Sequence, residues 1–108
     1  MMTRKAKILV NDLLAGILIE TADGEYTFQY DTAYLANDNN HPVSLTLPKQ
    51  KEVFHSKTLF PFFDGLIPEG WLMDIGAKNW KLHYKDRMGL LLYLCTDCIG
   101  NVSVINET

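Results

Sequence analysis

Two cysteines separated by two residues, Cys95 and Cys98, form a C-x-x-C motif, the first spacing in the chain that could carry chemistry. Redox pairs and half zinc sites share this spacing. A zinc site needs two more ligands, and His41, His55 and His83 show no paired spacing. A thioredoxin-like pair lies between a strand and a helix start, whereas this pair follows an apolar helical run. We therefore expect inert thiols and no metal site, with a small redox or metal protein as the alternative.

Glycines and carboxylates around residue 70 suggest two other kinds of site. Gly65 and Gly70 have the glycine spacing of a phosphate-binding P-loop, but a tryptophan follows where that loop needs lysine. Asp64, Glu69 and Asp74 offer carboxylates, yet a glycosidase pair needs a sugar-sized cleft, which so small a domain gives little reason to expect. Helix capping and solvation account for these carboxylates. The sequence therefore predicts no catalytic residue and no cofactor.

Length and charge favour one domain that binds no nucleic acid and no membrane. The 108 residues, 47% of them hydrophobic, suffice for a single core, so we expect one domain over residues 1–108. The net charge of -3 argues against direct binding of nucleic acid, and Arg4, Lys5 and Lys7 are interpreted as a solvated tail. Apolar runs reach about seven residues, where a membrane-spanning helix needs about 20. We expect a cytoplasmic protein without a secretion signal.

Alternating and β-branched residues predict an antiparallel meander followed by a returning strand. The expected strands are residues 7–10, 14–20, 26–30, 43–47 and 101–105. Asn11-Asp12-Leu13 joins the first two, and Asp23-Gly24 is expected to supply the positive φ angles of a tight hairpin. The three aromatic residues of the third strand share one face. Gly16 indicates a bulge or close packing.

Two helices are expected in the second half of the chain. Pro68 and Glu69 suit the first turn of one helix. The other runs over about residues 86–95 and belongs in the core, because it is apolar nearly all round. Residues 36–42 are expected to form a mobile surface loop, and residues 49–58 an exposed polar loop. The predicted class is α+β, a small antiparallel sheet made of a meander plus a C-terminal strand, with two or three helices.

Trp71 stands at the polar edge of the first expected helix, beside Asp74 and Lys78 on a 3.6-residue period. One interpretation has its ring fold back over Phe62 or Phe63 and extend the core. The other leaves the ring partly exposed as an anchor for a partner, because exposed tryptophans are enriched among residues that dominate interfaces. The residues alone leave both interpretations open.

Three short motifs, taken in order, resemble the N-terminal domain of the HipA family of toxin kinases. LTLP at residues 45–48 comes first, FFDGLIPEG at residues 62–70 is the most specific, and DCIGN at residues 97–101 follows. The second motif matches the family pattern F-F-D-x-L-L-P-E-G with isoleucine in place of one leucine. The third carries asparagine in place of the usual alanine. The resemblance covers about residues 6–105 and implies the fold of that N-terminal domain.

The kinases of this family carry their nucleotide-binding and catalytic elements in a continuation, so the resemblance implies no kinase activity in a chain that ends before it. It implies a subunit like HipS, the antitoxin of three-component HipBST systems. Such a subunit neutralises a HipT-like kinase toxin in a ternary complex with a HipB-like DNA-binding protein. The alternative is a truncated scaffold domain of a full-length HipA-type kinase.

We expect the contact with the kinase to come from the second motif and the residues just after it. The expected contact residues are Phe63, Asp64, Pro68, Glu69, Gly70, Trp71 and Asp74. Among them, we expect Trp71 to project toward the kinase active site and obstruct nucleotide binding or the closed catalytic arrangement.

Overall fold

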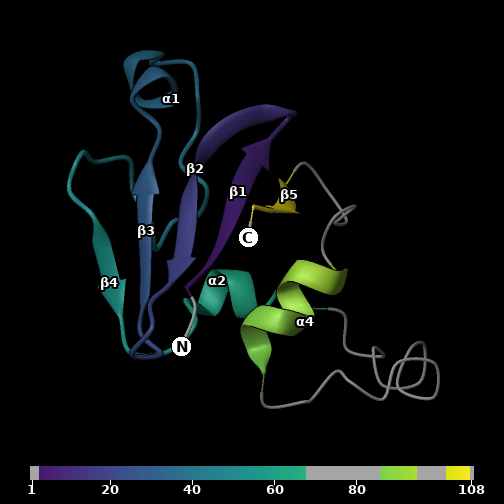
Figure 1. Cartoon of the computed structure of the whole chain (residues 1–108). Helices are drawn as coiled ribbons and strands as arrows, with labels where there is room; N and C mark the ends of the chain where they lie inside the picture. The colour runs from purple at the N-terminus through teal and green to yellow at the C-terminus, as the bar shows by residue number, and fades with distance from the viewer. Residues whose placement is uncertain (1–2, 68–85, 95–101, 108) are drawn as a thin grey trace.

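The computed structural model describes residues 3–67, 86–94 and 102–107 of the chain (Figure 1). The described strands are β1 (Arg4–Val10), β2 (Leu13–Glu20), β3 (Tyr26–Tyr30), β4 (Phe54–Ser56) and β5 (Val102–Asn106). The described helices are α1 (Thr32–Ala36), α2 (Pro61–Asp64) and α4 (Arg87–Leu94). None of these helices is long and apolar enough to cross a membrane.

The five strands form one antiparallel sheet in the order β4-β3-β2-β1-β5. The first three strands are a meander, and β5 returns to pair with β1, where Val104 lies opposite Ile8. Helices α2 and α4 contact each other beside the sheet, and α1 lies toward its opposite end (Figure 1). The predicted α+β class, a meander plus a C-terminal strand, is confirmed.

One face of the sheet carries the core, because alternate residues of each strand point to the same side. Phe28 of β3 is fully buried, and its ring centroid lies 5.0 Å from that of Tyr30 and 5.5 Å from that of Phe63 in α2. Helix α4 adds three side chains with no exposed surface, which are Met88, Leu90 and Leu91. The expectations of an aromatic face on β3 and of a core helix at α4 are both confirmed.

The two turns of the meander have different backbones. Asn11 and Asp12 have φ angles of 52° and 67°, as a two-residue hairpin needs when its strands carry the natural twist. The loop at residues 21–25 is longer and is closed by the Thr21 N–H, which donates to the Glu25 carbonyl at 2.8 Å. In this loop only Gly24 has a positive φ, 83°. The expectation that Asp23 shares that geometry is wrong, because the longer loop turns with one such residue.

Gly16 is required by the close approach of β3. The register between β1 and β2 shifts beside it and leaves Ala15 as the extra residue of a β-bulge. A Cβ on Gly16 would lie 2.4 Å from the Gln29 carbonyl oxygen and 2.8 Å from the Phe28 ring. The bulge and the close packing expected at this glycine therefore both occur.

The fourth strand lies elsewhere than expected. Residues 43–47 form no strand, and only an isolated bridge joins Ser44 to Leu47. The alternation arises because both ends of a turn point inward, with Val43 8% and Leu47 2% exposed, while Leu45 near the tip is 96% exposed. Strand β4 instead lies within the polar stretch that was expected to be a loop, where Phe54 pairs with Phe28. A strand of three residues is too short to show a period in the sequence.

Helices α1 and α2 are absent from the sequence prediction because each is about one turn long. Asp31 caps α1 by accepting two backbone N–H groups of its first turn, and Pro61 occupies the first position of α2. Helix α4 lies within its expected bounds. The helix expected from Pro68 lies outside the described residues, and so do Cys95 and Cys98.

Two tyrosine hydroxyls attach the long connection between α1 and β4 to the sheet. The buried Tyr30 hydroxyl accepts the Val43 N–H at 2.8 Å and donates to the Leu47 carbonyl. Tyr34, stacked on Tyr30 with a centroid distance of 6.0 Å, donates its hydroxyl to the His41 carbonyl at 2.6 Å. Residue 36 ends α1, and residues 37–42 form the expected surface loop, whose base is held by these hydrogen bonds.

Replacing Tyr30 with phenylalanine is expected to lower the free energy of unfolding by about 2 kcal/mol, because a buried N–H and a buried carbonyl lose their shared partner. Tyr34→Phe is the matched control, since it removes one hydrogen bond to a residue at the surface, and we expect it to lose about 1 kcal/mol or less. Urea denaturation of both variants and the wild type measures the difference. Equal losses would show that the Tyr30 hydroxyl does not hold the turn.

Candidate partner-binding site

The described part of the expected binding motif is α2 with the turn after it. Phe63 of this helix and Phe60, the residue just before the helix, both face the core. The ring centroid of Phe63 lies 5.3–6.1 Å from those of Phe28, Phe60 and Phe62, and its side chain has no exposed surface. Although Phe63 was expected to contact the partner, it serves in this structure as a core residue that positions α2, because a fully buried ring offers no surface.

Asp64 lies on the outer side of α2 and pairs with Arg87, the first residue of α4. The Asp64 Oδ1 atom is 2.5 Å from the Arg87 Nε atom, and the two side chains are 41% and 37% exposed. A pair at this exposure contributes little to stability. The pair shows that the end of α2 lies beside the start of α4.

Five of the expected contact residues lie outside the described part of the chain: Pro68, Glu69, Gly70, Trp71 and Asp74. Their contacts stay predictions. The described residues on either side of residues 68–85, Ile67 and Asp86, are both fixed in the structure. Ile67 is 6% exposed within the core, and Asp86 is bound by an arginine of β1.

That arginine, Arg4, joins the sheet to the start of α4. Its Nη1 and Nη2 atoms donate to the two carboxylate oxygens of Asp86 at 3.0 and 2.7 Å, and its Nε atom donates to Glu20 at 2.6 Å. The Tyr26 hydroxyl donates to the other Glu20 oxygen at 3.0 Å. The hydrogen bonds to Asp86 and then to Glu20 raise the pKa of Arg4 above its ordinary value. The expectation of a solvated basic tail is wrong for Arg4. Strand β1 begins at this residue, and the alternation of the strand places the Arg4 side chain on the same face as Ala6.

Asp86 also caps α4. Its Oδ1 atom accepts the Gly89 N–H at 3.2 Å, and its carbonyl accepts the Leu90 N–H at 3.0 Å. A Cβ on Gly89 would lie 2.4 Å from the Asp86 Oδ2 atom, so glycine leaves room for the carboxylate that binds Arg4. Sequence reasoning missed this cluster, although two signals were present. The alternation of β1 continues back to Arg4, and an aspartate directly before an apolar helical run is a capping pattern.

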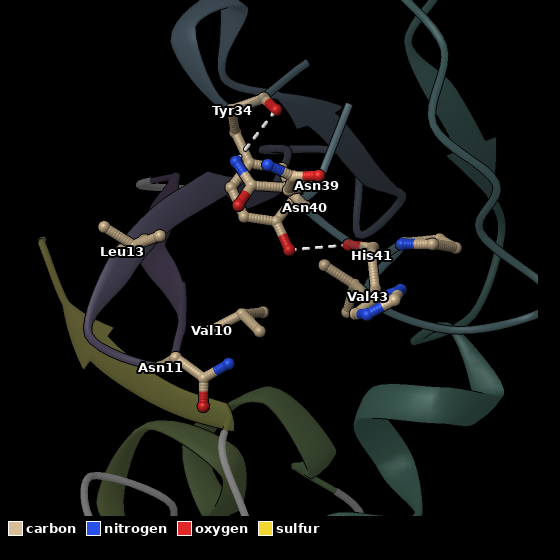
Figure 2. Close-up of a pocket in the computed structure, with 9 residues that line it drawn as sticks. Val10, Asn11, Leu13, Tyr34, Asn39, Asn40, His41 and Val43 are labelled. Atoms are coloured by element: carbon tan, nitrogen blue, oxygen red, sulfur yellow. Dashed lines mark hydrogen bonds between the residues drawn. The ribbon is translucent and has the colours of Figure 1, made fainter. Parts of the chain in front are cut away.

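A small cavity lies between the β1–β2 turn and the loop after α1 (Figure 2). Its lining residues are Val10, Asn11, Leu13, Tyr34, Asn39, Asn40, His41, Pro42 and Val43. Its volume of about 90 Å³ is well below the ~300 Å³ at which ligand sites begin. Tyr34 already bonds across it, through its carbonyl to the Asn40 side chain at 3.1 Å and through its hydroxyl to His41. Within the described residues, no three His, Cys, Asp or Glu side chains gather as a metal site.

Replacing Arg4 with methionine is expected to lower the free energy of unfolding by about 1–2 kcal/mol, because two carboxylates lose their shared cation at a partly buried site. Lys7→Met is the matched control on the same strand. It removes a pair between Lys7 and Glu107 at 3.1 Å whose side chains are 47% and 35% exposed, and should change stability by less than about 0.5 kcal/mol. Chemical denaturation compares the variants, and indistinguishable curves would refute a structural role for Arg4.

Alkaline pH is expected to weaken the fold through its tyrosines. Burial, followed by the bond to Glu20, raises the pKa of Tyr26 to about 12, and burial also raises the pKa values of Tyr30 and Tyr34. A tyrosine whose pKa rises on folding stabilises the fold fully below its unfolded pKa near 10, and loses that contribution as pH rises further. The melting temperature followed by circular dichroism should therefore fall between about pH 10 and 12. A level profile over that interval would contradict the assignment.

Comparison with known proteins matches nearly the whole chain to one family. The family model described as the HipA N-terminal domain matches residues 6–105. A Haemophilus influenzae (strain Rd) protein named "Uncharacterized protein" is 32% identical over 106 residues, which cover 98% of this chain and 95% of that protein. The protein named "Putative kinase Y4mE" of Sinorhizobium fredii is 33% identical over 94 residues, which cover 87% of this chain and 22% of that protein.

A solved structure gives the same match in three dimensions. The N-terminal domain of HipA toxin superposes on this chain with a TM-score of 0.75 at 30% identity, covering 100% of this chain and 96% of that one. The fold that the sequence motifs implied is therefore confirmed. The match spans nearly all of the Haemophilus relative but only about a fifth of the Sinorhizobium one.

Proposed function

The chain belongs to the HipA N-terminal domain family, and from this premise we propose that it is an antitoxin that binds and inhibits a HipT-like serine/threonine kinase toxin. The observation that carries the proposal is that the domain is found in two settings. It matches 22% of a protein named as a kinase and 95% of a protein about its own size. A domain that adjoins a kinase in one chain retains, as a separate subunit, the surface that faced its neighbour.

The proposed action is binding, and the kinase supplies all of the chemistry. Phosphoryl transfer needs a nucleotide cradle, metal-binding carboxylates and a catalytic aspartate, which the rest of a kinase chain provides. The net charge of -3 fits a protein partner better than a nucleic acid. Contact with an operator is therefore assigned to a HipB-like DNA-binding protein in a ternary complex.

We place the contact with the kinase at the second sequence motif, from Asp64 to Trp71. The support comes from the two ends of residues 68–85. Asp64 pairs with Arg87, and Arg4 binds Asp86, so the chain enters and leaves this segment at neighbouring fixed points. The described residues that border the proposed contact are therefore held close together, which gives the contact a defined place on the domain.

Trp71 is the proposed anchor of the contact, projecting toward the kinase active site where it obstructs nucleotide binding or the closed arrangement. The residues proposed to contact the kinase beside it are Asp64, Pro68, Glu69, Gly70 and Asp74. A large aromatic ring that is desolvated at the centre of an interface commonly contributes 2 kcal/mol or more, roughly thirtyfold in affinity.

A scaffold role inside a longer HipA-type kinase is the second candidate. The match to 22% of the Sinorhizobium kinase favours it, because the domain there shares a chain with other segments. The DNA sequence after the codon for residue 108 distinguishes the two. A stop codon followed by a kinase gene favours the antitoxin, and a continuous reading frame favours the scaffold.

If the DNA sequence places a HipA-type kinase gene beside this one, the test is a phosphotransfer assay of that kinase with and without an equimolar amount of this protein. We expect transfer of labelled γ-phosphate from ATP to be lost when the protein is present. Trp71→Ala should weaken inhibition at least tenfold, and Trp71→Phe should retain part of it, because a smaller aromatic ring fills part of the same space. Circular dichroism and thermal unfolding control for folding of each variant.

Each contrary outcome has its own meaning. Full kinase activity in the presence of the bound wild-type protein would sink the antitoxin proposal and favour a scaffold. Full inhibition by Trp71→Ala would refute the anchor and leave the antitoxin proposal standing. An unfolded Trp71→Ala variant would instead show that the ring extends the core over Phe62 or Phe63.

A further inference from the structure

An exposed leucine at a turn is not accounted for by the fold. Leu45 is 96% exposed, whereas Leu13, the other exposed large hydrophobic residue among those described, is 51% exposed. Single exposed apolar side chains are common and by themselves indicate no site. What distinguishes Leu45 is the structure that holds it.

The turn Ser44–Leu47 is braced from within. The Leu47 N–H donates to the Ser44 carbonyl at 3.0 Å, the Thr46 N–H donates to the Ser44 hydroxyl at 3.2 Å, and the Ser44 and Thr46 hydroxyls bond at 3.0 Å. None of these bonds involves the side chain at position 45. The turn therefore gains nothing from leucine there.

The base of the same turn is anchored in the core. Val43 and Leu47 are buried, and both bond to the hydroxyl of Tyr30. Pro42 and Pro48 stand outside them, and their fixed φ angles stiffen the chain on each side. The result is an apolar side chain on a preorganised support, which loses little conformational entropy when a partner covers it.

The charge around the turn restricts the class of partner. Residues 44–47 carry no charge, and the nearest cation in the sequence, Lys49, donates to the carbonyls of Asn37 and Asn40 at 3.0 Å each. A nucleic acid or an anionic membrane surface is bound by clustered cations, and residues 42–48 contain none. The turn instead matches an apolar recess on a folded protein.

We propose that Leu45 is a second docking point on the kinase, entering an apolar recess outside the site that Trp71 is proposed to reach. This inference rests on the proposed function. A turn of four residues is too small for a stable interface alone, since such interfaces bury about 800 Å² per partner. The turn therefore adds to a larger contact, and the kinase proposed to bind the second motif makes such a contact. A second copy of this chain that touched only the turn would bury too little surface for a stable interface.

The experiment uses isothermal titration calorimetry to measure the dissociation constant between this protein and the purified HipA-type kinase used in the phosphotransfer assay. Leu45→Ser should bind roughly tenfold to hundredfold more weakly, the loss expected for one buried leucine side chain. Leu45→Met should remain within about threefold of the wild type, because it keeps an apolar group of similar volume. Leu13→Ser, which removes an exposed leucine elsewhere, should match the wild type. The melting temperature of Leu45→Ser should be unchanged, because the side chain is 96% exposed.

Combining Leu45→Ser with Trp71→Ala tests whether the two contacts are separate. Losses in binding free energy that add indicate independent points of contact, whereas a double variant no weaker than one single variant would place both residues in one site and overturn the second docking point.

The remaining outcomes separate this inference from the proposed function. Equal affinity of Leu45→Ser and the wild type would overturn the docking point and leave the antitoxin proposal intact. Absence of binding by the wild-type protein would remove both. If Leu45→Ser binds the kinase normally but converts a dimer of this chain to a monomer in light scattering, the turn contacts a second copy and the kinase assignment is wrong.

Discussion

One guanidinium, that of Arg4, connects the sheet of this protein to the start of helix α4. Arg4 opens β1, a strand with neighbours on both sides, and its nitrogens reach Glu20 on β2 and Asp86 before α4. Asp86 binds Arg4 and also caps α4, so one carboxylate links the sheet to the start of the helix and explains the need for glycine at position 89. The core beneath is apolar, and this polar cluster at its margin sets how the two layers align.

The sequence predicted the parts of the fold that depend on near neighbours. The alternation of β3, the close approach at Gly16 and the apolar run of α4 are properties of a few consecutive residues, so their patterns survive without knowledge of the fold. The prediction of a strand at residues 43–47 was wrong for the same reason, because a turn with two buried ends has the same alternation of apolar and polar residues as a strand. Strand β4 and helix α2 are too short for any period to appear.

The candidate site was likewise predictable only in part. Its motif was recognisable as a string of residues, but the burial of Phe63 depends on Phe28, which lies on a distant strand. Arg4 and Asp86 are separated by 82 positions, and no local pattern relates them. An ion pair of this kind is visible only when the fold brings its members together. The reading of Arg4 as a solvated tail residue followed from treating the N-terminus by its composition, when the alternation of β1 already placed it on the inner face.

The pairing of β5 with β1 also affects the order in which the sheet can form during translation. The hairpins of β1, β2 and β3 close over short loops, so they can form while the chain is still on the ribosome. Val104, which lies opposite Ile8, emerges only after nearly all of the remaining residues. Until then β1 presents an unpaired backbone edge beside apolar side chains, which is a template for strands of other nascent chains. Strand β5, the last of the described strands along the chain, covers this edge of β1 and becomes the edge of the sheet in its place. A chain stalled before it would be prone to aggregate.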